Sequence, residues 1–98
     1  MRYSIADPAK TDLRSIRAYL NRHGEDGWPI VNRELRRTFR MLAESPHIGF
    51  MEPEWSDQPV RFFIVYSYII AYDPRPRPIM VLGVIHAALD VGRVLRRR

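Results

Sequence analysis

Apolar residues early in the chain recur with a helical period after a short alternating segment. Residues 2–6 (RYSIA) alternate polar and apolar side chains, which predicts a first strand. Asp7-Pro8 then predicts a helix start, because aspartate accepts hydrogen bonds from free backbone N–H groups and proline fits the first helical turn. The apolar positions that follow at intervals of three or four residues are Ala9, Leu13, Ile16 and Leu20. We expect a helix that runs to about Arg22 and is ended by Gly24.

A second helical pattern covers residues 29–44. Its apolar side, at about 100° per residue, consists of Val31, Leu35, Phe39 and Leu42. The opposite side holds four arginines within an arc of roughly 100°, namely Arg33, Arg36, Arg37 and Arg40. A break at residues 26–29 (DGWP) precedes this helix, and Ser45-Pro46 ends it because the residue before proline disfavours the α conformation. Two helices joined by a short loop predict an antiparallel helical hairpin.

Strand patterns dominate the second half of the chain. Residues 47–59 have the composition of a loop, and we expect its Trp55 to dock on the core. Residues 60–65 and 68–72 are rich in β-branched and aromatic side chains. They predict a hairpin that turns at residues 66–67.

The last part of the chain contains one further strand. Residues 73–78 (DPRPRP) form a proline-rich turn, which excludes regular structure. Residues 79–85 (IMVLGVI) are nearly all apolar, which predicts a central strand buried on both faces. Residues 87–98 are compatible with a short helix and end in three arginines.

The predicted order is therefore β-α-α-β-β-β. This order is typical of an α+β fold in which an antiparallel sheet carries a helical hairpin on one face. The chain has 98 residues, so we expect one domain over residues 1–98. The other sheet face and the sheet edge are left less covered, and a partner could bind at either.

The composition is basic and arginine-rich. Sixteen residues are Lys or Arg, Lys10 is the single lysine, and the net charge is +5. Arginine makes forked contacts with phosphate and carboxylate, so a basic surface predicts an acidic partner, either nucleic acid or an acidic protein segment. A solvated charged face is the alternative interpretation.

Several classes of protein are excluded or disfavoured. The chain has no cysteine, which excludes disulfides, thiolate metal sites and a cysteine nucleophile. The histidines at positions 23, 47 and 86 show no ligand spacing, so we expect no metal and no cofactor. No apolar segment approaches the roughly 20 residues that a membrane helix needs, and no signal peptide is visible. We therefore expect a cytoplasmic protein without membrane association.

Two residues are candidates for chemistry. His86 follows the long apolar strand and could act as a general acid or base, or could cap the strand end with a hydrogen bond. Arg61 opens an otherwise apolar strand and could contact phosphate or a partner protein. The alternative for Arg61 is a salt bridge to Asp57 or Glu54. Arg75 and Arg77, on the proline-rich turn, are expected to be solvated.

The remaining candidates are groups of side chains. Four like charges at the spacing of Arg33, Arg36, Arg37 and Arg40 repel one another, and the group is either a solvated face or a contact surface for an acidic partner. The strand aromatics could stack RNA bases, although core packing is the favoured interpretation for Phe62, Phe63, Tyr66, Tyr68 and Tyr72.

Four segments, in order along nearly the whole chain, resemble the ParE/RelE toxin superfamily, and its ParE branch in particular. These segments are residues 4–20 (SIADPAKTDLRSIRAYL), 42–50 (LAESPHIGF), 59–73 (PVRFFIVYSYIIAYD) and 81–90 (VLGVIHAALD). Members of the superfamily often carry arginines within the last strand and two residues after its histidine. Gly83 and Ala88 stand at those positions here. The departures count against ribonuclease activity.

The resemblance implies a toxin that binds and poisons DNA gyrase without chemistry of its own and is held by a ParD-like antitoxin. The alternatives are a RelE-type ribosome-dependent mRNA endoribonuclease using His86 and Arg61, and an inactive corepressor that only binds the antitoxin. We assign antitoxin binding to Arg33, Arg36, Arg37, Arg40 and Arg61. We assign target binding to Arg93, Arg96, Arg97 and Arg98. Nucleic acid would be contacted directly only by a RelE-like activity.

Overall fold

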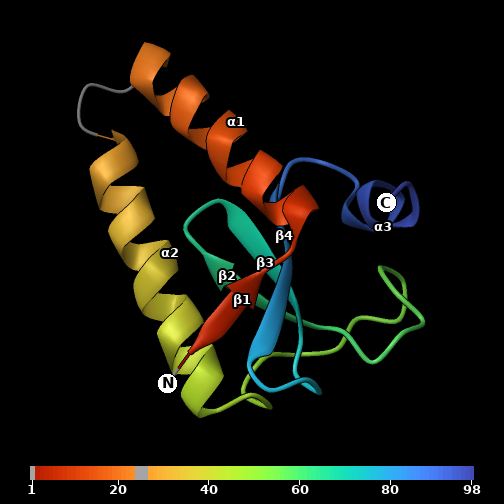
Figure 1. Ribbon diagram of the computed structural model, residues 1–98. Helices are drawn as coiled ribbons and strands as arrows, with labels where there is room; N and C mark the ends of the chain where they lie inside the picture. Colours follow the sequence, from red (N-terminus) through yellow and green to blue (C-terminus); the bar gives the residue numbers. More distant parts are fainter. Residues whose placement is uncertain (1, 24–26) are drawn as a thin grey trace.

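The computed structural model describes residues 2–23 and 27–98. Its elements (Figure 1) follow in the order β1 (Tyr3–Ile5), α1 (Asp7–His23), α2 (Gly27–Glu44), β2 (Arg61–Val65), β3 (Tyr68–Asp73), β4 (Ile79–His86) and α3 (Val91–Arg96). The predicted α+β fold is confirmed, including the short C-terminal helix. The second helix begins two residues earlier than expected, with Pro29 in its first turn, where a missing N–H costs nothing. Gly24, the expected end of the first helix, and Asp26 lie outside the described residues.

The four strands form one sheet in the order β1-β4-β3-β2. β2, β3 and β4 make the predicted antiparallel meander, whereas β1 pairs in parallel with β4, so the sheet is mixed rather than wholly antiparallel. β4 has a neighbour on each side, and most of its residues are buried, as its apolar sequence predicted. Within the described residues, every helix is too short or too polar to cross a membrane.

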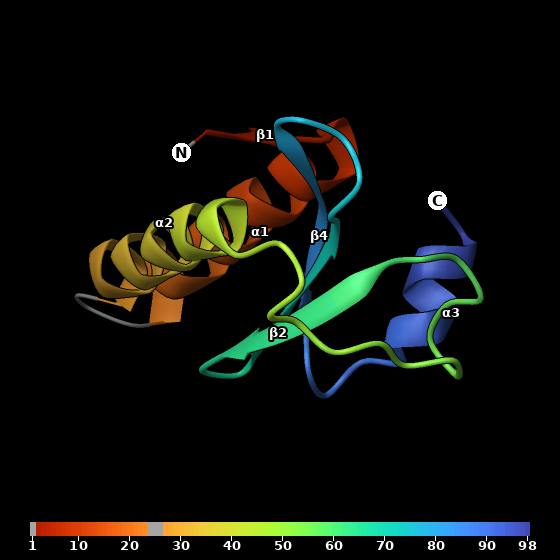
Figure 2. The same cartoon turned by 90° about the horizontal axis from the view of Figure 1, so that it is seen from below.

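Both faces of the sheet carry a hydrophobic core. The helical hairpin covers one face, where Leu35, Phe39 and Leu42 of α2 are completely buried. α3 lies on the opposite side of the sheet (Figure 2) and contributes Val91 to a second, smaller cluster. Trp55 packs on this second cluster, as predicted for a docked loop residue. The second face is therefore better covered than the sequence suggested, because the tail and the loop of Trp55 fold back over it.

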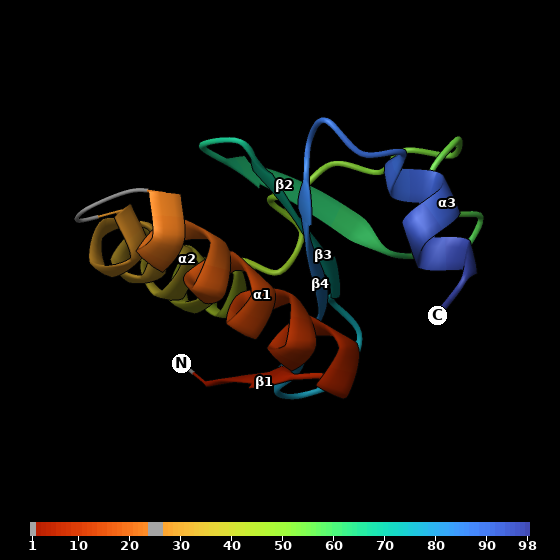
Figure 3. The same ribbon diagram turned by 90° about the horizontal axis from the view of Figure 1, so that it is seen from above.

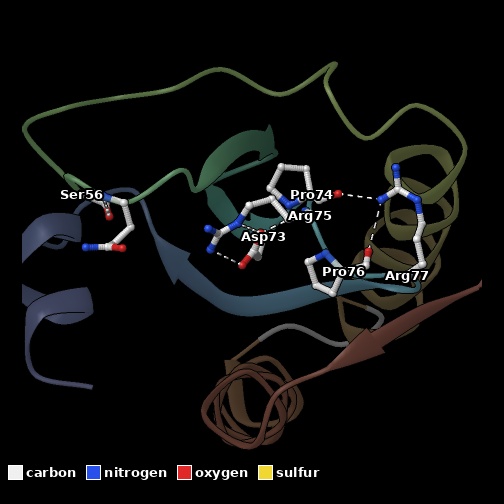
Figure 4. A network of polar contacts seen from close by, with 7 residues as sticks. Ser56, Asp73, Pro74, Arg75, Pro76 and Arg77 are labelled. Carbon is white, nitrogen blue, oxygen red and sulfur yellow. Dashed lines mark hydrogen bonds and ion pairs between the residues drawn. The ribbon is translucent and has the colours of Figure 1, made fainter.

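The two arginines of the proline-rich turn between β3 and β4 are hydrogen-bonded to other residues of that turn (Figure 4). Arg75 donates from Nε and Nη2 to the two carboxylate oxygens of Asp73, at 3.0 and 2.9 Å. These hydrogen bonds lower the pKa of Asp73 and raise that of Arg75. Arg77 donates to the carbonyl oxygens of Pro74 and Pro76. Both arginines are exposed, as expected, but each is engaged within its turn.

The loop after α2 is anchored by Tyr72, which is completely buried. Its hydroxyl donates to the carbonyl of Pro46 at 2.7 Å and accepts from the N–H of Gly49 at 2.9 Å. A Cβ at position 49 would lie 2.5 Å from that hydroxyl oxygen, so the close approach requires glycine. Burial raises the pKa of Tyr72.

Tyr72→Phe is expected to lower the free energy of unfolding by about 1–3 kcal/mol, because it leaves the buried Gly49 N–H and the partly buried Pro46 carbonyl without this partner. The measurement is urea unfolding at neutral pH, with Tyr66→Phe as the control, since Tyr66 is 59% exposed.

The wild type should also lose stability as the pH rises above the ordinary tyrosine pKa of 10.0, because the unfolded chain then releases a proton that folded Tyr72 still holds. The variant should lack this part of the alkaline sensitivity. Equal stability losses in both variants would contradict the anchoring role.

Candidate functional site

Three of the four predicted arginines form an exposed stripe along α2. Arg33, Arg37 and Arg40 point to solvent, and the only ion pair among them within the described residues is the long one between Arg37 and Glu34, at 4.0 Å. Arg36 differs from them because it is half-buried and donates to the side chain of Asn32 at 3.2 Å. We call Arg33, Arg37 and Arg40 the arginine stripe.

Arg36 belongs instead to a basic groove between the two helices. The groove has a volume of about 340 Å³, and its cationic lining residues are Lys10, Arg14, Arg17 and Arg36. Lys10 lies 3.8 Å from the carboxylate of Asp7, and Arg14 donates to Thr11. Sequence reasoning missed this groove, although the three α1 cations recur at helical spacing, because nothing local showed that Arg36 turns toward them. The hairpin therefore carries two neighbouring basic surfaces.

Arg61 is turned inward on the protein's own backbone. Its Nη1 donates to the carbonyl of Gly49 at 2.8 Å and to that of His47 at 3.3 Å. The salt bridge to Asp57 or Glu54, considered as the alternative, is not among the ion pairs of the described residues. A half-buried arginine with these two partners holds the loop after α2 against the edge strand β2.

His86 ends β4 in an exposed position. Its Nδ1 accepts a hydrogen bond from the backbone N–H of Ala88 at 3.0 Å, which is the capping role considered for it. Its ring also packs edge-on against Tyr68, with the centroids 5.6 Å apart. In the register of the sheet, His86 lies opposite Tyr68 and Arg61 lies opposite Tyr72. The two candidates therefore lie near opposite ends of β3. The two β3 positions are four residues apart, about 13 Å along the strand, and the candidates also lie on different sides of β3. The structure therefore does not bring them into one site.

The C-terminal arginines divide into two kinds. Arg93, Arg96 and Arg97 are exposed on or just after α3, and we call them the C-terminal cluster. Arg98 instead donates from Nη1 and Nη2 to the carboxylate of Asp12 on α1, with the first bond 2.8 Å long. Arg98, the fourth arginine assigned to target binding, thus differs from the other three because it is bonded to an internal carboxylate.

The sequence suggested that the region around Gly83 lacks basic groups, but the structure places one there. A Cβ at position 83 would lie 2.7 Å from Nη1 of Arg98. The Arg98 guanidinium thus fills the space beside β4 where a side chain at position 83 would begin. Arg98 also lines a mostly apolar cavity of about 380 Å³ between α1, β4 and the C-terminal segment. No local sequence signal could have placed Arg98 there, because the contact with Asp12 spans 86 residues.

The strand aromatics serve the core, with one exception. Phe62, Tyr68 and Tyr72 are buried, and Phe63 packs partly buried against the larger cluster. Tyr66, at the hairpin turn, is exposed and adopts a positive φ of 53°. Core packing is therefore confirmed for all but Tyr66. In residues 2–23 and 27–98, no group of three His, Asp or Glu side chains is close enough to hold a metal ion.

Comparison with known proteins assigns the chain to a family. A search of curated proteins found no match. The family model described as "ParE toxin of type II toxin-antitoxin system, parDE" matches residues 3–91, which include every strand and both long helices. The resemblance noted in the sequence is thereby confirmed. This chain belongs to the ParE toxin family of type II toxin–antitoxin systems.

Proposed function

We propose that this toxin acts in the cytoplasm by binding DNA gyrase, stalling it on cleaved DNA, and that a ParD-like antitoxin neutralises it. The observation that carries the proposal is that two groups of exposed arginines lie on different elements of the fold. The arginine stripe lies on the helical hairpin, and the C-terminal cluster lies with α3 on the other side of the sheet (Figure 3). Two separate basic surfaces fit a protein with two different partners.

The hairpin is the proposed surface for the antitoxin. The arginine stripe and the neighbouring basic groove together present seven cations: Arg33, Arg37 and Arg40 with Lys10, Arg14, Arg17 and Arg36. An acidic segment laid along α2 would pair with the stripe, because carboxylates accept forked hydrogen bonds from arginine. We leave Arg61 out of the proposed antitoxin surface because its Nη1 donates to two backbone carbonyls of the protein itself.

The C-terminal cluster is the proposed surface for the target. Arg93, Arg96 and Arg97 are close in sequence and exposed, so they can approach a large partner. The separation of His86 from Arg61 also favours binding over catalysis. A ribonuclease needs its acid or base and its phosphate clamp within reach of one substrate group.

Purified toxin is expected to increase the fraction of plasmid DNA that gyrase leaves cleaved, in a manner that depends on toxin concentration. The same effect in cells would appear as DNA-damage signalling after expression without the antitoxin. The control is toxin mixed with the product of a neighbouring short reading frame, which should restore uncleaved DNA. Ribosome-dependent mRNA cleavage that is lost in His86→Ala would instead establish the ribonuclease alternative. Normal growth on expression of folded toxin would favour the inactive corepressor.

A further inference from the structure

On the side of β4 that faces β1, side chains bind the backbone groups that lie beyond the end of β1. β1 pairs only with Ile79–Val81 of β4, and the last backbone bond to that side joins Ala6 to Val81. Beyond it, the N–H of Val84 donates to Asp12 Oδ2 at 2.9 Å, and the carbonyl of Leu82 accepts from Arg98 Nη1 at 3.3 Å. Unpaired backbone groups at a sheet edge need partners. Asp12 and Arg98 supply them here in place of a strand.

The two side chains also pair with each other. The Arg98 guanidinium contacts both oxygens of the Asp12 carboxylate, in the forked geometry that gives the strongest charge-assisted bonds. Both side chains are partly buried, with exposed fractions of 24% for Arg98 and 15% for Asp12. Solvent therefore screens this pair less than it screens the pair of Asp73 and Arg75, in which the arginine side chain is 62% exposed.

The pair lies where the C-terminal segment needs support. α3 has only six residues, which is too short for a helix to be stable without tertiary contacts. At its start, Val91 is buried, and Gly92 approaches the backbone of Glu54 and Trp55 so closely that a Cβ would meet it at about 3 Å. At its end, Val94 and Leu95 are only partly buried. Beyond these apolar contacts, Arg98 joins that end to Asp12 of α1 and to the Leu82 carbonyl of β4.

We propose that Asp12 and Arg98 form a latch that holds α3 against the edge of β4 and thereby positions the C-terminal cluster for its target. Both are positioning residues, since neither is itself free to bind the target. The positioning of the cluster for a target rests on the function proposed above, whereas the latch itself does not. Arg93, Arg96 and Arg97 lie between Val91, which is buried in the second cluster, and Arg98, so their arrangement depends on both attachments.

The first test of the latch is hydrogen exchange on the whole toxin. In Arg98→Ala, the amides of Val94 and Arg97, which donate to Asp90 and Arg93 in the wild type, are expected to exchange about tenfold faster or more. Amides of α1 and of the sheet should keep their protection, which shows that the domain is still folded. Arg75→Ala is the matched control, because it removes an arginine with a carboxylate partner elsewhere. Unchanged exchange in Arg98→Ala would overturn the latch.

Two further variants separate the pair from its neighbours. Asp12→Asn keeps an oxygen that can accept from Val84 but removes the charge that binds Arg98, so it should reproduce the exchange of Arg98→Ala. The double variant Asp12→Asn/Arg98→Ala should exchange no faster than either single variant, because both break the same contact. Additive effects would mean that the two residues act independently, which contradicts the proposal.

The positioning role is tested by growth inhibition, which does not presuppose gyrase as the target. Arg98→Ala is expected to need about tenfold more expressed toxin for the same growth arrest, and Arg98→Lys should recover part of the loss. If the tail of Arg98→Ala exchanges faster but its toxicity is unchanged, the proposed positioning of the C-terminal cluster is overturned. Failure of the wild type to act on gyrase in vitro would refute the proposed target alone, because the exchange and growth measurements would still decide the latch.

Discussion

Replacing Arg93, Arg96 and Arg97 together with glutamine is expected to abolish growth inhibition while the toxin still binds its antitoxin. The three side chains are exposed, so their neutralisation should leave the fold intact. A charge pair at a surface contributes up to roughly fivefold in affinity. Losing three of them should therefore weaken target binding by up to about 100-fold. The measurements are growth after induction and stimulation of DNA cleavage by purified gyrase.

Deletion of residues 94–98 is a less selective test of the same surface. It removes Val94 and Leu95, which pack against the second core cluster, and it also removes Arg98, which binds Asp12. A non-toxic deletion could thus result from a disordered tail rather than from lost cations. The glutamine variant avoids that ambiguity, and full toxicity in it would rule out the C-terminal cluster as the target surface.

Replacing the arginine stripe, Arg33, Arg37 and Arg40, with glutamine is expected to weaken antitoxin binding by about 100-fold and to leave toxicity unchanged. Arg36 is left in place because it hydrogen-bonds to Asn32 and lines the groove rather than the stripe. The measurement is the dissociation constant of the complex at low and physiological salt. The loss should shrink at high salt, because screening already weakens the wild-type contacts.

The two triple variants are matched controls for each other. Each changes the net charge from +5 to +2, because three arginines become neutral. A general effect of charge would therefore alter both properties in both variants. Opposite losses, of toxicity in one and of antitoxin binding in the other, would support two distinct surfaces. Equal antitoxin affinity in the stripe variant and the wild type would exclude the stripe from the interface.

The sequence predicted the elements because their signals are local. Helical spacing of apolar residues identified α1 and α2, and continuous apolar character identified β4 as a buried strand. The burial of Leu35 and Phe39 and the exposure of Arg33 and Arg37 follow from one helical period. Periodicity could not show that Arg36, between them, turns toward α1.

The tertiary structure decided which distant residues meet. β1 lies beside β4 rather than beside a neighbour in sequence, and its shortness leaves part of the β4 edge to Asp12 and Arg98. Arg61 is occupied by carbonyls of a loop that Tyr72 holds in place. These contacts depend on how the chain returns to itself over 12 to 86 residues, and a local pattern carries no information about that return. The sequence by itself determined the family, the elements and the basic character of the surface, whereas the fold alone determined which of the arginines are free to bind.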